Sequence, residues 1–213
     1  MISIQTFVFN SFSENTYILS DETKECVIID PGCFDKNEQE EIIGFIKNND
    51  LVPKYILITH GHIDHVLGIS DLKTTFNIPI WLPKEEESTY NAVPSYASSY
   101  GFEGYAHAPA DYLISENEEV KFGISTLNTV FVPGHSAGHA AFINIEENIC
   151  IGGDILFNGS IGRVDLPGGD FDTLIANIKT KLFTLNESIV VYPGHGPTTT
   201  IKHEKATNPF FAN

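Results

Sequence analysis

Apolar residues along this chain gather in short runs, and polar turns containing Gly or Pro interrupt them. β-Branched and aromatic residues dominate these runs, which is typical of strands. The runs 15–19 and 26–30 bracket the polar turn 21–24 and therefore predict a hairpin. The full set of predicted strands covers residues 3–9, 15–19, 26–30, 55–58, 78–82, 119–122, 125–131, 140–145, 148–151 and 189–192.

Other stretches place their apolar residues at helical spacing. Residues 38–48 do so among acids and amides, and Asp35 or Asn37 precedes them as an N-cap. Residues 66–76 and 173–185 also predict helices. Strands separated by helices, in two hairpin-rich halves, predict an α/β protein in which two sheets pack together and helices cover the outside.

Residues 84–110 break this alternation. Aromatic residues stand there among Ser, Gly and Pro, namely Tyr90, Tyr96, Tyr100, Phe102 and Tyr105. One interpretation is a helix and a loop whose rings pack on the sheets. The other is a segment that covers a substrate, since long irregular segments beside a site often do so. The sequence leaves both interpretations open.

A dense group of polar residues follows the apolar run 55–58. Within Thr59–His65 the sequence reads THGHIDH, with three imidazoles and a carboxylate. His60 and His62 lie two residues apart, so on extended backbone both rings point to the same side and can bind one ion. Asp64 and His65 face elsewhere and can begin a second site. The alternative, a polar loop with chance histidines, explains poorly why so many lone pairs gather at a strand end.

Three later stretches repeat one pattern, an apolar run followed by a Gly or Pro turn and a side chain that can bind a metal. These side chains are His135, Asp154 and His195. Each alone is a weak signal, because a single histidine is more often a hydrogen-bonded core residue. Strand ends can converge on one cleft, and the combined five histidines and two aspartates suffice for two ions with a position left open for water.

Composition narrows the choice of partner and compartment. The chain has 213 residues, 42% of them hydrophobic, which is enough for one sizeable core and a single domain. With 28 acidic residues against 12 basic ones the formal charge is −16, so we expect neither nucleic acid nor anionic membranes as partners. Cys26, Cys33 and Cys150 form no CxxC pair and favour buried thiols in a reducing compartment. Without a targeting or membrane-spanning pattern, a soluble cytoplasmic protein is expected.

Several motifs carry a resemblance to a known family. THGHIDHVLG, TVFVPGHSAGH, GGDILFNGSIGR, VYPGHGP and the closing TNPF resemble the metallo-β-lactamase superfamily over nearly the whole length. Within it, the chain is most similar to short glyoxalase II-like (hydroxyacylglutathione hydrolase-like) enzymes. This resemblance implies a four-layer αββα sandwich, one domain over residues 1–213, with the site at its open edge.

The resemblance also implies a set of metal ligands. His60, His62 and His135 would hold one divalent ion, and Asp64, His65 and His195 the other. Asp154 would bridge the two, because its two oxygens can each serve one ion and hold them about 3.5–4 Å apart. Zinc is expected, and iron or manganese also suit mixed nitrogen and oxygen ligands. Two such ions would create a bridging hydroxide at neutral pH. Asp64 would either orient this hydroxide or accept a proton from it, or serve as a metal ligand alone.

The sequence indicates less clearly the roles of residues outside the predicted metal ligands. The resemblance places His139 in support of the site, and Asp30 in the DPG turn is expected to fix the loops under the metals. Arg163, the only arginine, either clamps a turn or binds a substrate carboxylate. Lys202 and Lys205 are further candidates for substrate contact. Two further histidines, His107 and His203, do not have the spacing of metal ligands, so we expect both at the surface.

The resemblance implies hydrolysis of a small thioester such as S-lactoylglutathione. Recognition of glutathione stays open, because the sequence ends soon after His195 whereas full-length glyoxalase II enzymes add a C-terminal helical domain. A β-lactam substrate is disfavoured, since β-lactamases generally carry Cys or Ser where this chain has Asp154. Two alternatives remain: a mono-iron persulfide dioxygenase using His60, His135 and Asp154, and a non-catalytic metal-binding domain. The sequence specifies no oligomeric state.

Overall fold

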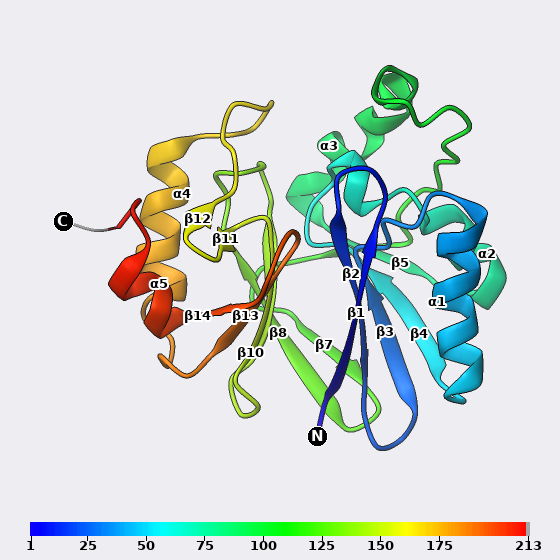
Figure 1. Cartoon of the computed structure of the whole chain (residues 1–213), viewed down its shortest axis with the longest axis horizontal. Coiled ribbons are helices and arrows are strands. Elements are labelled where there is room, and N and C mark those ends of the chain that lie inside the picture. The colour runs from blue at the N-terminus through cyan, green and yellow to red at the C-terminus, as the bar shows by residue number, and fades with distance from the viewer. Residues whose placement is uncertain (212–213) are drawn as a thin grey trace.

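Two six-stranded sheets pack face to face, and helices cover both outer faces (Figure 1). This arrangement is seen in a computed structural model that describes residues 1–211, so the last two residues of the predicted domain lie outside the described part. The predicted four-layer αββα sandwich is confirmed. In Figure 1, α1 and α2 cover one sheet, and α4 and α5 cover the other.

The first sheet contains the N-terminal strands in chain order. β1 to β3 are antiparallel, and β3 to β6 are parallel to one another. Parallel neighbours need crossover connections, and α1 and α2 supply two of them. The bounds are β1 Ser3–Phe9, β2 Glu14–Ser20, β3 Glu25–Ile29, α1 Lys36–Asn48, β4 Val52–Leu57, α2 Ile69–Phe76, β5 Ile80–Pro83 and β6 Tyr112–Ile114.

The second sheet has the order β14-β13-β10-β9-β8-β7, with only β10 and β13 pairing in parallel. A small two-stranded ribbon, β11 with β12, lies beside it. The bounds are β7 Glu119–Phe122, β8 Ser125–Phe131, β9 Ala140–Asn144, β10 Ile149–Gly153, β11 Leu156–Phe157, β12 Ser160–Ile161, α4 Phe171–Asn177, β13 Val190–Pro193, β14 Thr199–Thr200 and α5 Ile201–Thr207.

Buried side chains form three layers of core. Neighbouring residues of one strand serve different layers: Ile29 belongs to the core between the sheets, and Ile28 to the core under α1 and α2. On the other sheet, Ile151 faces the middle layer and Cys150 packs toward α4 and α5. Because both faces of the central strands are covered, their sequences are continuously apolar rather than alternating. All three cysteines are free and buried, as expected.

Several predicted elements differ in extent. The helix expected over 66–76 begins only at Ile69, as α2, and a separate 3-10 turn at Ile63–His65 precedes it. Gly68 is the N-cap of α2, and a side chain there would collide with the carbonyl of Cys33, at 2.6 Å from its Cβ. The helix expected over 173–185 is α4 continued by a π-helix, Ile178–Leu182. β6 and α5 were not predicted at all.

The structure decides between the two N-cap residues predicted for α1. Asp35 is the N-cap of α1, with Oδ1 accepting from the amides of Asn37 at 2.8 Å and Glu38 at 3.0 Å. Glu38 reciprocates toward the Asp35 amide, which completes a capping box. The alternative cap Asn37 is therefore excluded, because it lies inside the helix.

The aromatic segment 84–110 folds into short helices: η2 Lys84–Glu86, α3 Glu87–Ala92, η3 Val93–Ser95 and η4 Ala97–Tyr100. Tyr90 is fully buried, and its hydroxyl donates to the carbonyl of Ala108. The rings of this segment thus pack on the sandwich, and its other side borders the cavity described below, so that covering a substrate stays a prediction. Among residues 1–211, no helix combines the length and apolar character that crossing a bilayer requires.

Candidate metal centre

The predicted ligands come from strand ends at one edge of the sandwich. His60 and His62 follow β4, His135 follows β8, and the remaining late ligands, Asp154 and His195, follow β10 and β13. The structure brings them together in two groups, His60 with His62 and His135, and Asp64 with His65 and His195. The convergence expected from the repeated strand-turn pattern is thus present in the fold.

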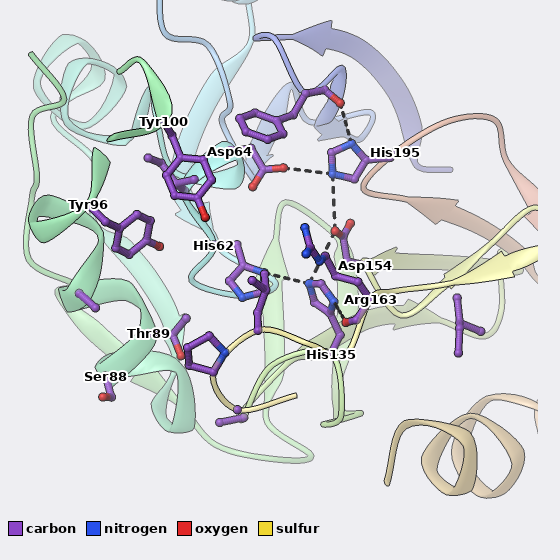
Figure 2. A pocket seen from close by; sticks show the side chains of 18 of the residues that line it. His62, Asp64, Ser88, Thr89, Tyr96, Tyr100, His135, Asp154, Arg163 and His195 are labelled. Carbon is purple, nitrogen blue, oxygen red and sulfur yellow. Dashed lines mark hydrogen bonds and ion pairs between the residues drawn. The ribbon is translucent and has the colours of Figure 1, made fainter. Parts of the chain in front are cut away.

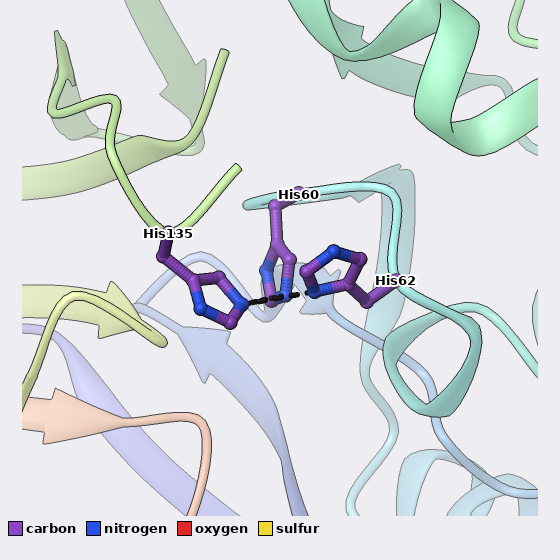
Figure 3. Close-up of side chains that lie close together, drawn as sticks. All are labelled: His60, His62 and His135. Carbon is purple, nitrogen blue, oxygen red and sulfur yellow. Dashed lines mark hydrogen bonds between the residues drawn. The ribbon is translucent and has the colours of Figure 1, made fainter. Parts of the chain in front are cut away.

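Three imidazoles of the first group point at one another (Figure 3). Nε2 of His135 lies 3.2 Å from Nε2 of His60 and 2.9 Å from Nδ1 of His62. Burial lowers the pKa of all three, to about 3 for His62 and well below its usual value for His60. These rings are therefore neutral at pH 7, as nitrogen ligands of a metal must be.

Hydrogen bonds at the far side of two rings assign their tautomers. Nδ1 of His135 lies 2.7 Å from the carbonyl oxygen of Arg163, which can only accept, so Nδ1 carries the proton. Nδ1 of His60 lies 3.0 Å from Oγ1 of Thr59, whose own hydrogen goes to Asp30 at 2.6 Å. His60 therefore also carries its proton on Nδ1. Both Nε2 atoms then present lone pairs to each other, an arrangement that a shared cation stabilises.

The second group combines two imidazoles with a carboxylate. Oδ2 of Asp64 lies 3.1 Å from Nε2 of His195 and 3.6 Å from Nε2 of His65. The outer nitrogens again face acceptors, since Nδ1 of His65 lies 3.2 Å from Asp30 and Nδ1 of His195 lies 3.1 Å from the carbonyl of Phe12. In His60, His135, His65 and His195 the outer nitrogen thus faces an acceptor and Nε2 points inward, the orientation that metal-ligating histidines usually have.

In the second group, neighbouring charges and hydrogen bonds shift the pKa values in the direction opposite to burial. Burial alone would lower the pKa of His195, but hydrogen bonds to Asp154 and Asp64 raise it to about 9. Burial would raise the pKa of Asp64, yet the charge of His65 and the hydrogen bond from His195 keep it below its usual value. In the metal-free protein, protons therefore occupy the places between these groups that cations can take.

Asp154 lies between the two groups (Figure 2). Its Oδ1 is 3.5 Å from Nε2 of His65, and its Oδ2 is 3.5 Å from Nε2 of His195 and 3.7 Å from Nε2 of His135. Two buried atoms that face each other here have no hydrogen-bond partner within residues 1–211, namely Nε2 of His65 and Oδ1 of Asp154. Unpaired buried polar atoms are costly, and this nitrogen and oxygen donor set fits two divalent cations.

His139 and Asp30 support the groups from outside. Nε2 of His139 accepts from the amide of Asp154 at 3.0 Å, and its ring stacks on that of His60 with centroids 4.5 Å apart. Asp30 is near enough to His60 and His65 to be a ligand itself. However, the amide and hydroxyl of Thr59 donate to its two oxygens at 2.7 and 2.6 Å, so a role in holding the loops fits better.

A cavity of about 790 Å³ opens beside the two groups. Asp64, His62 and Asp154 lie on one side of it, and Tyr96 and Tyr100 lie across from them (Figure 2). Phe12, Phe157 and Leu166 make the rest of the lining largely apolar, with hydroxyls from Ser88, Thr89 and Ser160. Segment 84–110 therefore forms a wall of the cavity.

Arg163 lies in the cavity lining and is already paired. Its Nε and Nη2 donate to the two oxygens of Asp165, each at 2.7 Å, and both side chains are exposed. The Arg163 guanidinium holds the pKa of Asp165 at about 2. The expected turn clamp is thus present, and the guanidinium also lies within reach of a molecule in the cavity.

The other predicted basic residues lie elsewhere. Lys202 and Lys205 are on α5, outside the cavity lining, and Lys205 pairs with Glu187 at 3.0 Å. The structure does not bring them to the site, because α5 covers the outer face of the second sheet (Figure 1). His203 is exposed on the same helix, whereas His107 is half-buried against Tyr105.

Two positioning groups escaped the sequence interpretation. Thr59 orients His60 through its hydroxyl, and Phe12 orients His195 through its carbonyl oxygen. Thr59 directly precedes the histidine run, so its place was a usable signal. A backbone carbonyl gives no such signal, since every residue has one.

Comparisons with known proteins agree with this geometry. The family model described as "Metallo-beta-lactamase superfamily" matches residues 10–195. The chain is 38% identical to hydroxyacylglutathione hydrolase GloC of Haemophilus influenzae over 98% of both proteins. It is also 38% identical to the probable metallo-hydrolase YqgX of Bacillus subtilis, over 91% of this chain and 90% of that protein.

Two solved structures are similar over nearly their whole length. One is the BLEG-1 B3 metallo-beta-lactamase, with a TM-score of 0.90 and 34% identity, covering 99% of this chain and 100% of that one. The other is TTHA1623 in a di-iron-bound form, with a TM-score of 0.86 and 34% identity, covering 97% and 99%. The chain belongs to the metallo-beta-lactamase superfamily and is a metal-dependent hydrolase of that fold.

Proposed function

We propose that this protein is a dinuclear metal-dependent thioesterase that hydrolyses a small thioester such as S-lactoylglutathione. The observation that carries the proposal is the inward convergence of imidazole nitrogens around Asp154, next to an open cavity. The name of the similar GloC protein supports the glutathione thioester as the substrate to test first. Zinc is the proposed metal, and the di-iron form of TTHA1623 makes iron the main alternative.

The residues of this chain have distinct tasks in this proposal. When bound, two divalent cations would lower the pKa of a shared water and polarise the thioester carbonyl. Asp154 holds the two ligand groups in register. Asp64 is ionised at neutral pH because its pKa is low, so its carboxylate can orient the water or accept a proton from it.

The cavity wall has to bind the rest of the substrate. Tyr96, Tyr100 and Phe157 provide apolar surface for the acyl or thiol portion and exclude water from the reacting carbonyl. Within residues 1–211 the cavity lining contains one arginine, Arg163, and no lysine, so its guanidinium is the proposed contact for a carboxylate of the thiol portion.

A turnover panel tests the proposal. Protein purified without added metal is analysed for its elements and assayed against S-lactoylglutathione, a simple acyl thioester, a β-lactam and glutathione persulfide with oxygen monitoring. The β-lactam is included because BLEG-1 is a metallo-beta-lactamase. We expect thioester hydrolysis that a chelator abolishes. Oxygen consumption with one iron per chain, or β-lactam turnover without thioester turnover, would contradict it.

A variant pair separates the site from the fold. Asp154→Ala removes the carboxylate between the groups and is expected to lower turnover at least ~100-fold, as removal of groups that tune a metal site commonly does. His203→Ala removes an exposed histidine on α5 and is expected to change nothing. Full turnover with both metals retained in Asp154→Ala would overturn the assignment.

A further inference from the structure

We infer that Glu86 is a positioning residue that joins the two loops carrying His60, His62 and His135 and ties both to the cavity wall. It is 0% exposed, it is not part of the cavity lining, and it forms no ion pair among residues 1–211. Instead it accepts two backbone hydrogen bonds, from the amide of Gly61 to Oε2 at 2.8 Å and from the amide of Gly138 to Oε1 at 2.5 Å.

The two amides belong to the loops that matter most for the first metal group. Gly61 lies between His60 and His62, and Gly138 lies three residues after His135. One loop follows β4 of the first sheet and the other follows β8 of the second. A single carboxylate therefore fixes how far the imidazoles of one sheet stand from the imidazole of the other.

The loops that carry Gly61 and Gly138 also pack closely against the segment that carries Glu86. A Cβ at Gly61 would lie 2.6 Å from the amide nitrogen of Tyr90, and a Cβ at Gly138 would lie 2.5 Å from Cβ of Glu85. Neither approach is possible for a residue with a side chain unless the backbone moves. Both loops thus press directly on the segment that carries Glu86, and glycine at each position permits it.

The same segment forms a wall of the cavity. Glu86 ends η2 and directly precedes α3, from which Ser88, Thr89 and Ala92 line the cavity (Figure 2). A molecule resting on this wall is therefore held at a set distance from the imidazoles. Through Glu86, segment 84–110 therefore also fixes the position of the cavity wall relative to the three imidazoles.

Chemistry favours a carboxylate in this role. Two N–H groups point at Glu86, and an ionised carboxylate only accepts hydrogen bonds, so each donor finds an oxygen. A glutamine of the same size would turn an NH₂ group toward one of the amides and leave that amide without an acceptor. The inference concerns metal binding and does not depend on which substrate is hydrolysed.

Glu86→Gln tests the inference by metal affinity. The apoprotein is titrated with Zn²⁺ and Co²⁺ against a competing chelator, and Co²⁺ absorption distinguishes the three-imidazole environment from the one containing Asp64. We expect about 10–100-fold weaker binding at the three-imidazole site, in line with other groups that orient ligands, and a smaller effect at the other. The control is Glu87→Gln, which alters the exposed neighbour and should leave both affinities unchanged.

Two outcomes would overturn it. Glu86→Gln that binds both metals with wild-type affinity, while only its unfolding temperature falls, would reduce Glu86 to a structural residue. Should Glu86→Gln fail to fold, Glu86→Asp keeps an acceptor-only side chain that is one methylene too short to reach both amides. Wild-type affinity for both metals in Glu86→Asp would equally contradict the inference.

Discussion

Nε2 of His60 and Nε2 of His135 lie 3.2 Å apart, and neither has a proton to share with the other. The other nitrogen of each ring is already committed, to Thr59 in one case and to the carbonyl of Arg163 in the other. Two lone pairs held this close repel each other unless a cation lies between them. A bound metal would therefore stabilise the arrangement that the fold holds.

Metal removal should consequently destabilise the protein. Ligands that bind only the folded state add stability, about 2.7 kcal/mol when their concentration is 100 times the dissociation constant. We expect the unfolding temperature to fall after chelation and to recover when Zn²⁺, Mn²⁺ or Fe²⁺ is added, as calorimetry can show. An unfolding temperature that is the same with and without metal would argue against a built metal site.

Asp30 offers a test of the outer hydrogen bonds. Its φ of 49° lies in the left-handed region, which Asn tolerates well, so Asp30→Asn should keep the backbone conformation. The new amide group would face either the donors of Thr59 or Nδ1 of His65, and metal affinity should fall about 10–100-fold. Asp50→Asn, at an exposed position with φ of 55°, is the matched control. Unaltered affinity in Asp30→Asn would exclude this orienting role.

Replacing Arg163 separates turn clamping from substrate contact. In Arg163→Lys the paired hydrogen bonds to Asp165 are lost, but an exposed ion pair contributes at most about 1 kcal/mol, so stability should hardly change. We expect KM for an anionic thioester to rise several-fold while kcat is kept. Asp165→Asn releases the guanidinium without removing it, so its KM should not rise. Identical KM values for wild type and Arg163→Lys would leave the arginine a turn clamp only.

The hydrogen bonds of Asp21, a residue outside the candidate metal centre, predict that the stability of the protein depends on pH. It joins the turn before β3 to the second sheet by accepting from the amide of Ile124 at 2.7 Å and from Oγ of Ser125 at 3.0 Å. Burial alone would raise the pKa of Asp21, but these bonds and those from Thr23 lower it. Its contribution is therefore present above the unfolded pKa of about 3.9 and is lost as pH falls through the lower folded value.

Denaturant unfolding of Asp21→Asn checks this sign. At pH 7 the variant should be less stable by about 1.5–3 kcal/mol, the range for hydrogen bonds to a charged group. The difference from wild type should stay constant down to about pH 5 and shrink below that, whereas Asp50→Asn should show no such trend. A difference that grows on acidification would contradict the argument.

The sequence could predict this fold because its central strands are covered on both faces and read as unbroken apolar runs, such as Ile28 beside Ile29. The convergence of the candidate ligands could also be predicted, since imidazoles and carboxylates stand at the ends of several predicted strands. β6 was missed because Tyr112 and Leu113 are exposed on a short edge strand and leave no apolar pattern. The close approach of Gly68, the N-cap of α2, to Cys33 is a tertiary contact, which local sequence does not encode.

Substrate-side residues were harder to predict for a similar reason. Lys202 was proposed from charge alone, and charge does not say which face of the sandwich a helix covers. Glu86 stands among three consecutive glutamates, and only the fold shows that it is the buried one. Contacts made through backbone amides and carbonyls, as at Gly138 and Phe12, depend on tertiary structure and have no residue-type signature.

Anomalous diffraction from crystals of the zinc-loaded protein tests the central claim most directly. We predict two anomalous peaks per chain on either side of Asp154, one against His60, His62 and His135 and the other against Asp64, His65 and His195. A single peak at full zinc saturation, or peaks away from Asp154, would contradict the dinuclear centre on which the proposed hydrolysis depends.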